Sequence, residues 1–260
     1  MLRVINLTKV YANGTVALKN VSFEVETGEF LAVIGLSGSG KSTLLRCINR
    51  LIDPTGGEIW LDDLNVTAAK GRHLRQVRRR IGMIFQQFNL VKRSSVITNV
   101  LTGRLGYTPP IWSLGNHFSR SDYQKAHDAL KRVGIPDKAN DRADELSGGQ
   151  QQRVGIARAL MQDPQLILAD EPVASLDPVL AHSIMGYLEE LNRTDGRTVL
   201  CSLHHLDLVQ RYADRVIGLR SGQIVYQGSR EQIRRLTDSE FADIYGAEAQ
   251  RLGSITGAQT

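Results

Sequence analysis

The sequence predicts an α/β fold with a mostly parallel sheet, an antiparallel β subdomain and an inserted α-helical subdomain. Short apolar runs rich in β-branched residues alternate with stretches of helical periodicity, which is the pattern of successive β-α-β units. Near the amino terminus, segments that alternate in polarity or are bounded by Gly and Asp are typical of an antiparallel sheet. Between residues 88 and 145 the pattern becomes helical with turn-rich interruptions, which predicts the inserted subdomain.

The expected elements follow in the order that this architecture requires. Strands of the parallel sheet are predicted at 30–35, 81–85, 166–170, 198–202 and 215–219, and antiparallel strands at 2–7, 17–25 and 57–61. Helices are predicted at 41–51, 121–133, 151–161, 179–192 and 206–212. We therefore assign residues 1–87 and 146–246 to a core, 88–145 to the helical subdomain and 247–260 to a carboxyl-terminal tail.

The composition is that of a globular protein with an ordinary core. Apolar residues make up 42% of the 260, and no apolar run approaches the roughly 18 residues that a membrane-spanning helix requires. The amino terminus lacks a secretory signal pattern, and two cysteines, Cys47 and Cys201, are too few for a disulfide framework. We therefore expect a location in the reducing cytosol.

The formal net charge of +5 admits nucleic acid, anionic lipid headgroups or a solvated surface as explanations. Residues 78–80 are three consecutive arginines without an interleaved aromatic side chain that could stack on a base. We interpret the excess charge as a solvated surface and expect no nucleic-acid partner.

A phosphate-binding loop is predicted at residues 35–42, where the sequence fits Gly, four residues, Gly, Lys and Ser. Because the loop follows an apolar strand and opens a helix, its N–H groups are expected to point at phosphate oxygens. A merely flexible Gly/Ser turn is the alternative, which the flanking strand and helix disfavour. We expect Lys41 to reach the β- and γ-phosphates and the Ser42 hydroxyl to ligate Mg²⁺. The residues expected to contact nucleotide are Gly35, Leu36, Ser37, Gly38, Ser39, Gly40, Lys41, Ser42 and Thr43.

Two carboxylates, Asp170 and Glu171, end a second apolar strand. Parallel sheets bind their ligands at the carboxyl ends of their strands, so we expect Asp170 to hold the Mg²⁺ shell. Glu171 is expected to orient and polarise the attacking water as a general base. Any strand can end in acidic residues at solvent, and it is the phosphate loop upstream that favours the catalytic interpretation.

A second glycine-containing turn, at residues 146–150, precedes a helical stretch and predicts a second anion site at a helix start. Ser147 is also a good N-cap, so an ordinary capped helix is the alternative. The run Leu-Ser-Gly-Gly-Gln-Gln-Gln-Arg resembles the signature motif of ABC-transporter ATPases, and it lies between the phosphate loop and the acidic strand as in that family. The resemblance implies a P-loop NTPase core that hydrolyses ATP, with ATP contacts from Ser147, Gly148, Gly149 and Gln150.

Further elements of that family occur in matching order. Gln86 resembles the glutamine that joins the core to the helical subdomain, which implies contact with the metal or the attacking water. Asp177, in Ser-Leu-Asp, resembles the loop that crosses the dimer interface and contacts nucleotide. His204 resembles the switch histidine that contacts the γ-phosphate, favoured over His205 by its register with the preceding strand. Tyr11 lies where the family places an aromatic side chain that stacks on adenine, although a Tyr near a strand end is often simply packed.

The resemblance also implies a head-to-tail dimer of two copies. The phosphate loop of one copy and residues 147–149 of the other would enclose the same ATP, so that neither copy has a complete site alone. The single phosphate loop and the absence of a membrane segment resemble the stand-alone ATPase subunits of importers. This implies membrane permease subunits as partners, a solute-binding protein as an indirect partner, and a peripheral position on the cytoplasmic face of the membrane.

Four segments narrow the resemblance to the ATP-binding subunits of phosphonate importers, namely residues 88–95, the long insert 105–119, 170–177 and 202–208. Phosphite or another phosphorus anion is the alternative cargo, and residues 86–98 are expected to receive a short helix of the permease. A non-transport ABC ATPase of DNA repair or translation is a different-class alternative, but such proteins generally carry a coiled coil or a tandem cassette. A phosphate-loop kinase is a further alternative, but such an enzyme does not require the turn at 147–149.

Overall fold

The computed structural model describes residues 1–108, 118–235 and 244–245. Its contacts separate two compact units, one formed by residues 1–67 and 200–260 and the other by residues 68–199. Most of the predicted long insert, with its turn at 113–116, and the tail predicted at 247–260 lie outside the described residues. Within the described ranges, no helix combines the length and the apolar character needed to cross a bilayer.

The first unit contains the predicted antiparallel sheet, with strand order β2-β1-β4-β5. Leu2, Val4 and Leu7 of the first strand are buried, which gives the sheet a core face. This strand runs three residues further than predicted, and so it carries the chain directly to Tyr11. The strands are β1 (Leu2–Val10), β2 (Val16–Val25), β4 (Gly56–Leu61) and β5 (Leu64–Asn65).

A second sheet of this unit is centred on the fully buried strand β3 (Phe30–Ile34). It lies between β8 (Thr198–Ser202), which is shared with the second unit, and β9 (Arg215–Arg220), with which it pairs in parallel. A half-exposed edge strand, β10 (Gln223–Ser229), pairs antiparallel with β9 and was not among the predicted elements. The helices of this unit whose bounds lie within the described residues are α1 (Lys41–Ile48), α8 (Leu206–Tyr212) and α9 (Arg230–Arg234).

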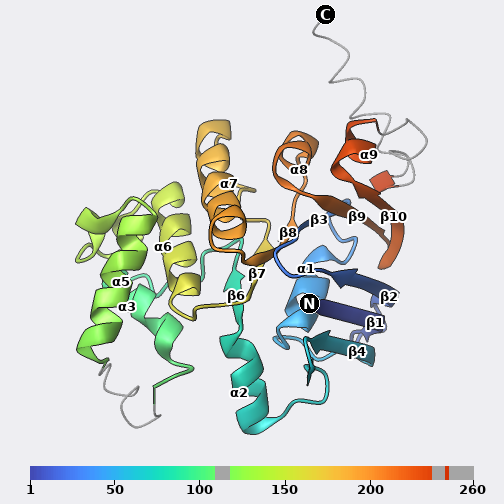
Figure 1. Ribbon diagram of the computed structural model, residues 1–260, viewed down its shortest axis with the longest axis horizontal. Helices are drawn as coiled ribbons and strands as arrows, with labels where there is room; N and C mark the ends of the chain where they lie inside the picture. Colours follow the sequence, from blue (N-terminus) through green and yellow to red (C-terminus); the bar gives the residue numbers. More distant parts are fainter. Residues whose placement is uncertain (109–117, 236–243, 246–260) are drawn as a thin grey trace, which may run out of the picture. The chain divides into compact units, whose positions relative to one another are not determined.

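The second unit combines a parallel strand pair with a group of helices. Strand β6 (Ile81–Ile84) pairs in parallel with β7 (Leu166–Asp170), and every residue of both is buried, as expected for strands covered on both faces. Helices α3, α5 and α6 pack against one another and lie side by side in Figure 1. In the described part of this unit the α-helices are α2 (Gly71–Arg79), α3 (Val96–Leu101), α5 (Arg120–Arg132), α6 (Gly148–Leu160) and α7 (Pro178–Arg193). Its 3₁₀ helices are η1 (Thr102–Arg104), η2 (Pro136–Lys138) and η3 (Ala143–Glu145).

Helix α6 begins at Gly148, three residues before the predicted start at residue 151. The Ser147 hydroxyl accepts a hydrogen bond from the Gln150 N–H (3.4 Å), and the Gln150 Oε1 accepts one from the Ser147 N–H (2.9 Å). This reciprocal capping box satisfies two backbone donors and outweighs the low helix propensity of the two glycines that follow the serine. The second glycine turn is therefore the first turn of the helix itself.

Candidate nucleotide site

The phosphate loop joins β3 to α1 and has a backbone that glycine is needed to form. Gly35 and Gly40 have φ angles of 142° and 111°. A Cβ on Gly35 would lie 2.2 Å from the Leu219 carbonyl oxygen, and a Cβ on Gly40 would lie 2.5 Å from that of Ala17. Any side chain at these two positions would clash with main chain, so the loop can close over the start of α1 only with glycine.

Two buried polar side chains line the interior of the loop. The Lys41 side chain is 3% exposed, and its ammonium group donates to the carbonyl oxygens of Gly35 (2.8 Å) and Leu36 (3.0 Å). The Ser39 hydroxyl is buried and has no hydrogen-bond partner among the described residues. A cation, an orphaned hydroxyl and a helix amino terminus in one tight loop suit a phosphate group, which accepts several hydrogen bonds. The loop therefore fits the predicted polyphosphate.

Tyr11 lies beside the start of α1. Its hydroxyl is 3.2 Å from the Thr43 hydroxyl, and the two form a part-buried hydrogen bond. The Lys9 ammonium lies 5.3 Å from the centre of the Tyr11 ring, within cation–π range. Two residues predicted to contact nucleotide, Tyr11 and Thr43, are thus brought together, although 32 residues separate them in the sequence.

His204 follows strand β8 after one buried residue. The Leu203 N–H donates to the carbonyl oxygen of Val33 in β3 (3.0 Å), so the chain remains attached to the sheet up to this point. His204 is half-buried, whereas His205 is exposed and serves as the N-cap of α8. His204 is thus the less exposed of the two histidines and directly follows the residue bonded to the sheet.

The acidic pair lies in the second unit, at the end of β7. Asp170 is fully buried, and Glu171, the next residue, is half-buried. The backbone of Glu171 has a φ of 48°, in the left-handed region. This conformation costs a residue with a side chain about 1 kcal/mol, and such strain clusters at functional sites. The left-handed backbone at Glu171 interrupts the regular alternation of side chains along the strand. No pattern in the sequence indicated this feature.

Gln86 lies two residues beyond the end of β6, on an exposed loop, and lines a cavity of about 700 Å³. Phe88, Gln151 of α6 and Ser175 contribute to the same cavity. The loop itself is fixed by Arg158, whose guanidinium donates to the carbonyl oxygens of Phe88 and Asn89. Arg158 was not among the predicted site residues, and only its position in α6, the helix that begins at the signature turn, could have indicated such a role.

Ser147 and Gly148 are exposed at the amino terminus of α6, while Gly149 is buried against Leu180. A Cβ on Gly149 would lie 3.0 Å from a methyl carbon of Leu180, so the second glycine allows α6 to pack closely on α7. Asp177 is also exposed, and its carboxylate accepts a hydrogen bond from the Leu180 N–H (3.0 Å) as the N-cap of α7. Two helix amino termini of this unit therefore carry residues predicted to contact nucleotide.

The predicted site residues divide between the two units. The first unit holds Tyr11, the loop 35–43 and His204. The second unit holds Gln86, Ser147, Gly148, Gly149, Gln150, Asp170, Glu171 and Asp177. Hydroxyl, carboxylate and amide oxygens are the ligands that Mg²⁺ prefers, so Ser42, Asp170 and Gln86 are suitable in chemical type.

A glycine-built phosphate loop, an acidic strand end and a second exposed helix terminus define a nucleotide-binding protein of the phosphate-loop class. The chain belongs to the ABC transporter family, whose model matches residues 18–174. The family resemblance inferred from the motifs is therefore confirmed. The matched range includes the phosphate loop, Gln86, the signature turn and the acidic pair.

Curated relatives match nearly the whole chain. The phosphonates import ATP-binding protein PhnC of Lactobacillus johnsonii is 54% identical over 245 residues, which cover 94% of this chain and 95% of the relative. The protein of the same name from Shouchella clausii is 53% identical over 250 residues, which cover 96% of this chain and 93% of the relative.

Solved structures confirm the predicted fold class. A dimeric ATP-binding cassette in a post-hydrolysis state, bound to ADP and Pi, has a TM-score of 0.79 and 36% identity, covering 88% of this chain and 99% of that one. The cbiO1 protein of Clostridium perfringens, part of an ABC transporter complex, has a TM-score of 0.77 and 30% identity, with 98% of each chain covered.

Proposed function

We propose that this chain hydrolyses ATP to drive a membrane importer of phosphonates. The observation that carries the proposal is the identity of 53–54%, over almost the whole chain, to relatives named as phosphonates import ATP-binding proteins. The geometry of the nucleotide site does not indicate the cargo, because this subunit contacts the nucleotide and the permease and not the cargo itself.

In this proposal the phosphate loop binds the triphosphate. The backbone N–H groups after Gly35 and the Lys41 ammonium contact the β- and γ-phosphates, and the Ser39 hydroxyl gains the partner that it lacks within the described chain. Tyr11 stacks on adenine and is oriented by its hydrogen bond to Thr43. These contacts bind and orient the nucleotide before any chemistry takes place.

Ser42, Asp170 and Gln86 are the residues proposed to hold Mg²⁺, which neutralises charge on the phosphates when it is bound. Glu171 acts as the general base: its carboxylate orients the attacking water and accepts a proton from it. The left-handed backbone at Glu171 supports this role, because it fixes the carboxylate apart from the buried Asp170 next to it. His204 contacts the γ-phosphate from the end of β8 and senses its loss.

Two copies of the chain act together. The exposed Ser147 and Gly148, with Gly149 and Gln150 behind them, present the amino terminus of α6 to the γ-phosphate bound by the other copy. Asp177 lies at the same dimer interface. A cassette at 36% identity whose structure is dimeric with ADP and Pi supports this arrangement.

The cavity beside Gln86 is the proposed docking site for a helix of the permease. Lys92 and Phe88 line it, Val91 beside Lys92 is 59% exposed, and Arg158 holds the loop from behind. The chain accordingly works as a peripheral subunit on the cytoplasmic face of the membrane, and a solute-binding protein delivers cargo on the other side. A crosslinker reacting from Lys92 should capture the permease in the assembled complex.

The decisive experiment is growth of a deletion strain on one phosphorus source at a time. Cells supplied with the wild-type chain should grow on an alkylphosphonate, and cells supplied with Glu171→Gln should not, although both should grow on phosphate. Rescue on phosphite but not on phosphonate would replace the cargo with the alternative phosphorus anion. Growth on phosphonate without the chain would refute the proposed function.

A further inference from the structure

Helix α2 carries a row of arginines on one face. Residues 70–80 contain Lys70, Arg72, Arg75, Arg78, Arg79 and Arg80, without a single carboxylate. At about 100° per residue, positions 72, 75, 78 and 79 lie within an arc of roughly 120°. Val77, the one buried residue of the helix, lies on the opposite side. The helix therefore fully buries one side chain and presents a basic face on the opposite side.

A cavity of about 490 Å³ adjoins this basic face. Arg75, Arg78 and Arg79 line one side of it, and the turn after η1 lines the other with Leu105 and Tyr107. None of the described residues that line it is acidic. Three guanidinium groups and no carboxylate in the described lining give the cavity a positive potential, which attracts anions.

One arginine and the opposite rim are held in place. The Arg79 Nε donates to the Gly106 carbonyl oxygen (2.6 Å), and the Tyr107 hydroxyl donates to the Gln162 carbonyl oxygen (2.8 Å). The guanidinium carbons of Arg79 and Arg104 lie 4.5 and 3.9 Å from the centre of the Tyr107 ring. The arginine–tyrosine contacts fix the rim and cover the ring, so a nucleic-acid base would have to displace a guanidinium to stack there.

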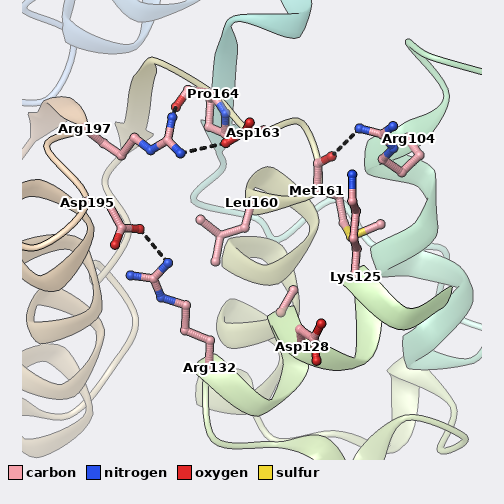
Figure 2. A pocket seen from close by; sticks show the side chains of 11 residues that line it. Arg104, Lys125, Asp128, Arg132, Leu160, Met161, Asp163, Pro164, Asp195 and Arg197 are labelled. Carbon is pink, nitrogen blue, oxygen red and sulfur yellow. Dashed lines mark hydrogen bonds and ion pairs between the residues drawn. The ribbon is translucent and has the colours of Figure 1, made fainter. Parts of the chain in front are cut away.

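A second cavity of the same unit is lined by both basic and acidic side chains. Figure 2 shows that cavity, of about 320 Å³, where Arg132 pairs with Asp195 (2.5 Å) and Arg197 pairs with Asp163 (2.6 Å). Its basic side chains are thus largely neutralised by neighbouring carboxylates. The described lining of the cavity beside α2 contains no carboxylate, so this cavity attracts anions more strongly than the other.

We infer that the basic face of α2 and the adjoining cavity bind phosphate groups of anionic phospholipid headgroups. Leu105 on the rim is 43% exposed, and an exposed apolar side chain beside basic residues inserts at the headgroup boundary of a bilayer. Arg72 extends the row beyond the cavity, which suits a surface of many charges better than one soluble phosphate. The inference rests on the proposed function for the position of the chain at a membrane.

Flotation of the full-length chain with lipid vesicles tests this inference. At low salt, the wild-type chain should float with vesicles of phosphatidylcholine mixed with phosphatidylglycerol, but not with phosphatidylcholine alone. Removing two cations in Arg72→Gln/Arg75→Gln should lower the partition coefficient roughly 30-fold, at about fivefold per cation. The control Lys125→Gln/Lys131→Gln on α5 removes the same charge from two exposed positions and should keep partition within about twofold of wild type.

Equal losses in the two double variants, or no flotation of the wild type with anionic vesicles, would overturn the inference. The source of the phosphate is separated by adding inorganic phosphate at constant ionic strength. Release from vesicles by phosphate, together with thermal stabilisation that Arg72→Gln/Arg75→Gln abolishes, would assign the site to a soluble anion instead. ATP hydrolysis in solution, measured in parallel, should be unchanged in both variants. A failure of the lipid-binding inference can therefore be distinguished from a failure of the proposed function.

Discussion

The guanidinium of Arg158 on α6 donates a hydrogen bond to the backbone carbonyl oxygen of Phe88, 2.8 Å away. A second bond, of 2.6 Å, reaches the carbonyl oxygen of Asn89. Both loop residues have left-handed backbones, with φ angles of 52° and 50°. The loop that carries Gln86 is therefore attached to the helix that begins at the Ser-Gly-Gly turn, and Arg158 stabilises its strained backbone.

Replacing Arg158 by Met should lower the free energy of unfolding by about 2–3 kcal/mol. The substitution keeps the length of the side chain but removes two hydrogen bonds from a charged donor, which at about 1.5 kcal/mol each, for bonds that are only partly buried, amount to about 3 kcal/mol. Urea denaturation of the full chain measures the loss. Arg93→Met, at an exposed position of the same unit, is the control and should change stability by less than about 0.5 kcal/mol. Similar losses for both variants would show that the bonds to Phe88 and Asn89 contribute nothing specific.

Tyr11 is expected to bind adenine through its ring rather than its hydroxyl. Tyr11→Ala should weaken Mg-ATP binding about 5- to 150-fold, because stacking of a base on an aromatic ring contributes about 1–3 kcal/mol. Tyr11→Phe keeps the ring, loses the bond to Thr43 and should bind more tightly than Tyr11→Ala. Titration calorimetry distinguishes the variants. If Tyr11→Ala binds as tightly as Tyr123→Ala, a control at an exposed tyrosine of α5, the ring only packs against α1.

Cys47 should make stability depend on pH in the alkaline range. It is fully buried on α1, and burial raises the pKa of its thiol from 9.0 to about 11. The unfolded chain releases this proton at lower pH than the folded chain does, so stability is retained below pH 9 and lost as pH rises toward 11. Between these values the wild type should lose about 2 kcal/mol more than Cys47→Ala in chemical denaturation. Parallel pH profiles would contradict the assignment.

Glu171→Gln should bind ATP normally and slow its hydrolysis about 10²- to 10⁴-fold, the range expected for loss of a general base. The amide has nearly the same shape but cannot accept a proton from water. Phosphate release at saturating Mg-ATP measures the effect. Glu231→Gln, at the exposed start of α9, should hydrolyse ATP at the wild-type rate. Wild-type turnover in Glu171→Gln would exclude this residue as the base.

Elements whose hydrophobic pattern matches their burial in the structure were predicted from the sequence. Strand β8 and helix α8 have the predicted bounds, because an apolar run and a clear helical period mark them. Helix α2 was not predicted, since its arginine-rich sequence has one buried residue and no apolar stripe. Strand β10 is a half-exposed edge strand, where alternation is weak.

The candidate site was predictable in its residue types but not in its three-dimensional details. Carbonyl oxygens distant in the sequence approach positions 35 and 40 so closely that only glycine fits there, and glycine is what the motif has at both positions. The left-handed backbone at Glu171 and the bonds from Arg158 to Phe88 arise from tertiary contacts that a linear pattern does not contain. The start of α6 was misplaced because its glycines suggested a loop, while the Ser147–Gln150 capping box fixes a helix.

We expect two copies to share each ATP, with the phosphate loop of one facing Ser147 of the other. Analytical ultracentrifugation of Glu171→Gln with and without Mg-ATP measures this association. The mass should be twice that of one chain with Mg-ATP and that of a single chain without it, and the addition of either Lys41→Ala or Ser147→Arg should abolish the dimer. A single-chain mass at saturating Mg-ATP, or a dimer that survives both added substitutions, would refute the shared site.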